Sequence, residues 1–193
     1  MKPKANIPAK ETDLKALSMA ELIDAAWHFS YATLWQERMY SKTAILLAKK
    51  HIRYYLVSHP LNRQQVFTQF IQRIMVADLC VTANETSYLC KPSAWFNGRN
   101  RLGFEATLST YTIVQSVQAA DNKFVQGIAI AAQSYWDYIR SPSPEIVSEC
   151  RSRLLELREF KLIQIFYNAI IYHQFLHPKS QEICQSQKSS TEG

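Results

Sequence analysis

Glycine and proline are scarce in this chain of 193 residues, which contains four glycines and seven prolines. Average usage would give roughly 13 glycines in a chain of this length. Sandwiches, barrels and nucleotide-binding α/β sheets need glycine at their many tight turns. The scarcity therefore disfavours those scaffolds and predicts an all-α protein, a helical bundle of six or seven helices.

Long apolar runs and paired cysteines are absent as well. No stretch approaches about 18 uninterrupted apolar residues, and the first dozen residues lack the apolar centre of a signal peptide. We therefore expect a cytoplasmic protein with no membrane association. The four cysteines stand far apart, with no Cys-x-x-Cys pair that could hold zinc or perform redox chemistry, which favours reduced thiols.

The apolar residues recur at helical spacing between two polar ends. This pattern predicts a flexible tail over 1–17, a single helical-bundle domain over 18–177 and a second flexible tail over 178–193. A capping box at Ser18 and Glu21 starts the first helix, Asp121 caps a later one, and Ser143-Pro144-Glu145 starts another. The expected helices cover 18–38, 41–58, 63–83, 104–120, 122–140 and 146–176, the last being one helix or two with a break near 156–159.

Signatures of catalysis are missing. Gly98-Arg-Asn-Arg-Leu-Gly103 has the glycine spacing of a P-loop but continues with Phe104 and Glu105 instead of Lys and Ser/Thr. His173 and His177 share a helical face, but no glutamate of a His-Glu-x-x-His pattern accompanies them. We therefore expect no catalytic residue, no metal and no cofactor. An enzyme would require a cleft in which His28, His51 or His59 meets a cysteine or a carboxylate, and sequence does not decide that geometry.

Positive charge is concentrated in one third of the chain. The net charge is +6, yet residues 41–101 contain nine basic and two acidic residues, and the remainder sums to −1. Such a concentration attracts polyanions, above all nucleic acid. The predicted nucleic-acid-binding residues are Lys42, Lys49, Lys50, Arg53, Arg63, Arg73, Lys91, Arg99 and Arg101.

The predicted second helix places Lys42, Lys49 and Arg53 on one stripe, and Arg63 and Arg73 extend it if the second and third helices pack antiparallel. Lysines and arginines neutralise phosphates without reading base sequence, which suits single-stranded DNA, RNA or a guide duplex. Trp95 and Phe96, near Arg99 and Arg101, either form a stacking platform for unpaired bases or anchor their loop in the core. The alternative function is an adaptor that contacts other proteins, with the basic segment meeting an acidic partner or folded against acidic helices of this chain.

The C-terminal half has a different composition. Arginines and glutamates alternate between 145 and 161, as on a solvated helix with i, i+4 pairs. Aromatic residues are frequent between Tyr135 and Phe175 and are expected in the core, while any that remain exposed would mark a partner surface. We expect this region to include a face for self-association or for docking to a larger subunit.

A basic, cysteine-poor helical chain of this size, with positive charge on its early helices, resembles the small subunits of multisubunit CRISPR effector complexes of antiviral defence. It is similar in charge to the helical accessory proteins of diversity-generating retroelements. The first resemblance covers roughly residues 18–177 and rests on architecture and charge, without a diagnostic motif. It implies a non-catalytic subunit that holds guide RNA or displaced DNA inside a larger ribonucleoprotein complex.

Overall fold

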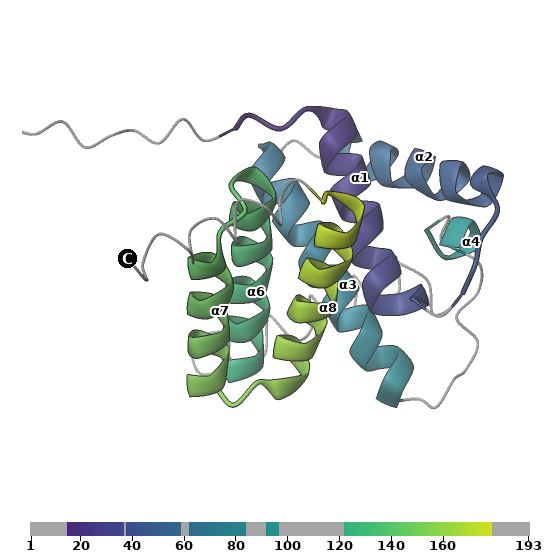
Figure 1. Ribbon diagram of the computed structural model, residues 1–193. Helices are drawn as coiled ribbons and strands as arrows, with labels where there is room; N and C mark the ends of the chain where they lie inside the picture. The colour runs from purple at the N-terminus through teal and green to yellow at the C-terminus, as the bar shows by residue number, and fades with distance from the viewer. Residues whose placement is uncertain (1–14, 37, 59–61, 84–91, 97–121, 179–193) are drawn as a thin grey trace, which may run out of the picture.

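The protein is all-α in the part of the chain that the computed structural model describes, residues 15–36, 38–58, 62–83, 92–96 and 122–178 (Figure 1). This confirms the predicted helical bundle. The elements are α1 (Met19–Ser30), the π-helical η1 (Tyr31–Trp35), α2 (Lys42–Ser58), α3 (Arg63–Ala83), α4 (Pro92–Phe96), α6 (Lys123–Arg140), α7 (Pro144–Glu156) and α8 (Phe160–Leu176). The helix expected over 104–120 lies outside the described residues.

Helix starts follow the local signals in the sequence. The Ser18 side chain accepts from the Glu21 amide and the Glu21 carboxylate accepts from the Ser18 amide, so the predicted capping box is present. Ser143 caps α7, and Pro144 occupies its first turn. The prediction for α6 was wrong by one residue, because the side chain that accepts from the first amides of α6 belongs to Asn122, not Asp121.

The first helix changes its winding after Ser30. Residues Tyr31–Trp35 continue as a π-helix, and the hydroxyls of Ser30 and Thr33 donate to carbonyls four residues earlier. Tyr31 then donates to the carbonyl of Arg38 at 2.8 Å, which ties the following turn to the helix. The wider winding keeps Trp35 buried in the core, where it contacts α4.

The core forms where α1, α3, α6 and α8 meet. Phe29 of α1 and Phe67 of α3 pack against the Tyr135 ring of α6, with ring centroids 4.8 and 6.2 Å apart. The buried Tyr135 hydroxyl donates to the carbonyl of Ala25. Two helices, α1 and α3, therefore converge on one side chain of α6.

A short turn separates α7 from α8, so the predicted break near 156–159 is confirmed. Arg158 adopts a left-handed conformation with φ of 60°, and the Glu159 amide donates back to the carbonyl of Leu154. The hairpin brings α7 and α8 against α6 at Gly127, where an added Cβ would lie 2.7 Å from Leu162 Cδ1. An alanine at this position would therefore force Leu162 to shift.

The second helix departs from the arrangement that we expected. It packs mainly against α1 and α4, and its contacts with α3 are fewer. Figure 1 shows α2 extending to the right from beside the upper part of α1, with α4 below it, while α3 descends toward the lower part of the view. The expected antiparallel pair of α2 and α3 is therefore replaced by α2 resting on α1 and α4, and this turns the outer side of α2 to solvent.

Candidate functional site

The outer face of α2 carries three of the predicted nucleic-acid-binding residues. Lys42, Lys50 and Arg53 are exposed, and α2 contains no acidic residue. Lys42 and Arg53 project within about 20° of each other around the helix and lie about 16 Å apart along it, at 1.5 Å per residue. We name Lys42, Lys50 and Arg53 the α2 basic face.

Two further predicted residues, Lys49 and Arg63, are engaged in contacts within the protein. Lys49 Nζ lies 2.8 Å from Asp24 Oδ1 of α1. The guanidinium of Arg63 donates to the carbonyl of Leu17 at 3.1 Å, which ties the start of α3 to the segment before α1. Leu17 is buried, so close packing begins slightly before the predicted start of the domain at residue 18.

The prediction that Arg73 extends an exposed basic surface is wrong. Arg73 is only 6% exposed, and its guanidinium stacks over the Tyr55 ring at 4.8 Å from the centroid. Its position follows from the helical period, because Arg73 comes two turns after Val66 and shares the inward side of α3. A buried guanidinium of this kind contributes to packing between α2 and α3.

Trp95 and Phe96 anchor α4 in the core, so the stacking platform that we considered for them is not formed. Both rings are buried; Trp95 contacts Trp35 at 5.6 Å between centroids, and Phe96 contacts Phe70 at 5.9 Å. The predicted residues Lys91, Arg99 and Arg101 lie outside the described residues.

Sequence reasoning missed the apolar part of the α2 surface. Leu46, Leu47, Tyr54 and Val57 are 45–76% exposed and lie among the cations of the α2 basic face. The predicted second helix has more apolar residues than one buried stripe can accommodate. This excess could have indicated that some of them would be exposed. The surface is therefore both cationic and apolar.

Among the described residues, no acidic side chain forms an ion pair with the α2 basic face; Asp24 pairs with the neighbouring Lys49 instead. Asp78 of α3 pairs with Lys161 of α8 at 3.4 Å. The acidic residues of α7 belong to the helix at the opposite side of the bundle from α2 (Figure 1). Glu37, the acidic residue that precedes α2 in the sequence, lies outside the described residues.

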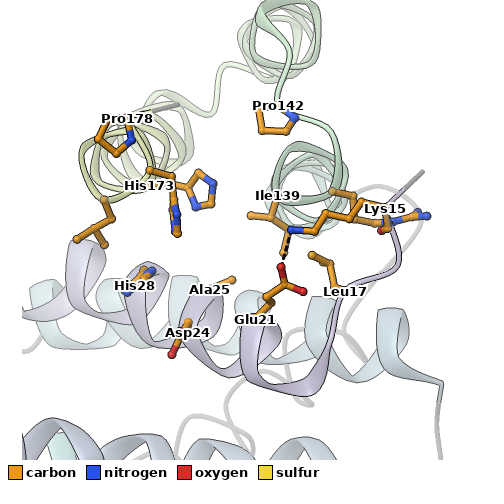
Figure 2. A pocket seen from close by; sticks show the side chains of 13 residues that line it. Lys15, Leu17, Glu21, Asp24, Ala25, His28, Ile139, Pro142, His173 and Pro178 are labelled. Atoms are coloured by element: carbon orange, nitrogen blue, oxygen red, sulfur yellow. Dashed lines mark hydrogen bonds and ion pairs between the residues drawn. The ribbon is translucent and has the colours of Figure 1, made fainter. Parts of the chain in front are cut away.

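A pocket of about 440 Å³ opens between the start of α1 and the ends of α6 and α8. Figure 2 shows His28 of α1 and His173 of α8 on its two sides, with the Lys15–Glu21 ion pair near its other end. His177 also lines it, with ring centroids 4.6 Å from His173 and 6.2 Å from His28. The fold thus gathers three histidines that the sequence places in two distant segments.

Two histidines of this pocket, His28 and His173, are neutral at pH 7. The pKa of each is lowered to about 4, mainly by burial and to a smaller extent by the neighbouring imidazoles. Asp24 opposes this effect at His28, whereas Lys49 adds to it. The Nδ1 atoms of both rings are buried and have no hydrogen-bond partner among the described residues.

A metal-binding cluster is not assembled in the described part of the chain. No three His, Cys, Asp or Glu side chains there gather closely enough to hold a metal ion. Cys150 is a free, buried thiol on α7, and burial raises its pKa to about 11, so it is protonated at neutral pH. Such a thiol is a poor nucleophile.

No family model, no curated protein and no solved structure matches this chain. Among the described helices, none combines the length and the apolar character needed to cross a membrane.

Proposed function

We propose that this protein is a non-catalytic subunit that holds single-stranded nucleic acid through the α2 basic face within a larger ribonucleoprotein complex. The observation that supports it is the set of exposed cations Lys42, Lys50 and Arg53 on a helix without an acidic residue. Three flexible cations spread over about 16 Å of helix match a phosphate backbone, which requires charge and reach but no fixed base sequence.

Single strands suit this surface better than duplex. Tyr54 is 76% exposed, one turn after Lys50 and adjacent to Arg53. An exposed aromatic ring beside cations offers a stacking surface to an unpaired base, and such stacking contributes about 1–3 kcal/mol per base. A duplex hides its base faces and would use only the cations.

The test is fluorescence anisotropy of a labelled oligothymidylate, measured over a range of salt concentrations. If three phosphates are neutralised, the logarithm of the association constant should fall with the logarithm of salt at a slope of about −2. The variant K50A/R53A should weaken binding at low salt and reduce the magnitude of this slope by about 1.4. The variant R151A/R153A on α7 removes the same charge elsewhere and should bind like the unmodified protein.

Two results would contradict the proposal. One is no binding of oligothymidylate at low salt, or binding that salt does not weaken. The other is an equal loss of affinity in the α2 and α7 variants, because it would mean that only total charge matters.

The second candidate is an adaptor that binds an acidic protein, and the exposed Leu46, Leu47 and Val57 favour it. A protein partner would bury these apolar side chains, whereas a phosphate backbone would leave them in water. The variant L46S/V57S separates the two functions. It should leave oligothymidylate affinity unchanged if nucleic acid is the ligand, and it should abolish capture of the partner if the protein is an adaptor.

A further inference from the structure

The outer face of α8 presents large apolar side chains to water. Phe160 is 65% exposed, Ile171 60% and Phe175 75%, although the opposite side of the same helix is buried against α1, α6 and α7. With 100° per residue, these three residues and the exposed Gln164 fall within about 60° around the helix. We call Phe160, Gln164, Ile171 and Phe175 the α8 stripe.

The α8 stripe carries no charge. Apart from His173, Lys161 is the only residue of α8 with a basic side chain. It lies beside the stripe and pairs with Asp78 of α3. The α2 basic face, in contrast, repels a copy of itself. An uncharged apolar face can contact its own copy without bringing like charges together, even in a protein with a net charge of +6.

The spacing of the α8 stripe is symmetric along the helix. Phe160 and Phe175 lie at equal distances from the point between Tyr167 and Asn168, and Gln164 and Ile171 do the same. A two-fold axis through that point would place Phe160 of each copy against Phe175 of the other. A surface that matches itself in this way is what a two-fold dimer requires.

From this symmetry we infer that the α8 stripe is the interface of a homodimer, in which the α8 helices of two copies pack antiparallel. Two such helices can approach to about 8–10 Å between axes when their side chains interlock. Each end of the interface is then an aromatic pair, and each side of the axis holds one Gln164–Ile171 contact. The α2 basic faces of both copies stay in solvent, so the dimer is independent of the proposed function.

The size of the α8 stripe predicts a weak dimer. Two phenylalanines of about 200 Å² each and one isoleucine, exposed as above, amount to roughly 400 Å² of apolar surface per copy. That is as large as the largest apolar patch of a typical monomer, about 300–600 Å². The total over two copies, about 800 Å², is below the 1,200–2,000 Å² of stable complexes, so association should depend on concentration.

Sedimentation velocity of the full chain from low micromolar to several hundred micromolar concentration tests the dimer. The unmodified protein should shift from monomer to dimer, and F160E and F175K should each weaken association at least tenfold, because each sets a charge against an aromatic ring. Mixing F160E with F175K should restore dimers, since the new glutamate of one chain then faces the new lysine of the other. Only the antiparallel register pairs these two positions.

The matched control is L46E, which adds the same charge at an exposed leucine of α2 and should leave association unchanged. Circular dichroism would check that each variant keeps its helices. A protein that is monomeric at every concentration would overturn the inference. So would association that L46E weakens and F160E does not, or a mixture of F160E and F175K that stays monomeric while each variant is folded.

Discussion

The α2 helix and the α7 helix both present basic side chains to solvent, but their surroundings differ. On α7, Arg151 and Arg153 share the helix with three glutamates, whereas α2 carries four basic residues and no acid. The two helices lie at opposite sides of the bundle, so the charges of one do not cancel those of the other (Figure 1). The same residue types thus give a balanced surface at one side and a cationic one at the other.

This difference shows why the number of basic residues in a segment is a poor measure of its surface. Of the four basic residues on α2, Lys49 is paired with Asp24, and three remain as the α2 basic face. On α3, Arg73 is buried against Tyr55. Packing decides which charges face a ligand, and the charge of the partner helices decides what potential they create.

The largest expected effect comes from core substitutions in α2 and α7, which test whether the two helices are equally firmly packed. Ile52 of α2 and Leu154 of α7 are both fully buried. I52A and L154A should each lower the free energy of unfolding by about 2–5 kcal/mol, because each leaves a cavity in the core. Urea denaturation would measure this. A loss below about 1 kcal/mol for I52A alone would indicate that α2 is loosely attached, and its exposed face would then need another explanation.

Lowering the pH should destabilise the protein through the histidines between α1 and α8. The α2 side of the molecule serves as the comparison. The pKa of His28 and of His173 is about 4 in the folded protein, below the ordinary value of about 6.5 that the unfolded chain retains. Between these values the unfolded state binds more protons, so stability falls as pH decreases from 6.5 to 4. The loss between pH 7 and pH 5 should be on the order of 2 kcal/mol for each histidine.

Urea denaturation at pH 7 and pH 5 measures that loss. The variant H28Q/H173Q should show a smaller difference between the two pH values, because glutamine does not titrate. H51Q, which changes a half-buried histidine of α2, serves as the matched control and should keep most of the difference. A pH dependence that survives in H28Q/H173Q would place its origin outside the pocket.

A smaller effect is expected where α6 meets the α7–α8 hairpin. In G127A, the added methyl group would lie 2.7 Å from Leu162 Cδ1, and Leu162 is fully buried and has little room to move. Overpacking costs about 1–3 kcal/mol, which the better helix propensity of alanine offsets by up to about 1 kcal/mol. We expect net destabilisation on thermal unfolding. The variant G127A/L162A should recover part of the loss caused by the clash, and a more stable G127A would show that the hairpin shifts freely.

The sequence predicted the helices better than it predicted the surface, for a physical reason. Helix starts depend on a few neighbouring residues, such as the capping box at Ser18 and the Ser143-Pro144 pair, and these local signals need no knowledge of the fold. The burial of Arg73 could also have been predicted from the sequence, since its spacing from Val66 places it on the inward side of α3. The orientation of α2, and with it the exposure of Leu46, depends on contacts with α1 and α4 that local pattern does not encode.

The smallest expected effect concerns the Lys49–Asp24 ion pair, which joins α2 to α1. Its side chains are 26% and 52% exposed. Exposed ion pairs contribute about 0–1 kcal/mol, so K49A should change the free energy of unfolding very little.

D24N should also change the free energy of unfolding very little, but it frees Lys49 to join Lys42, Lys50 and Arg53. If the α2 basic face binds nucleic acid, D24N should therefore bind oligothymidylate more tightly than the unmodified protein, with a salt dependence steeper by about 0.7. The variant E149Q on α7 removes the same charge at the opposite side of the bundle and should leave that slope unchanged. Equal gains in D24N and E149Q would mean that net charge alone governs binding, and the contrast between the two helices would then have no functional meaning.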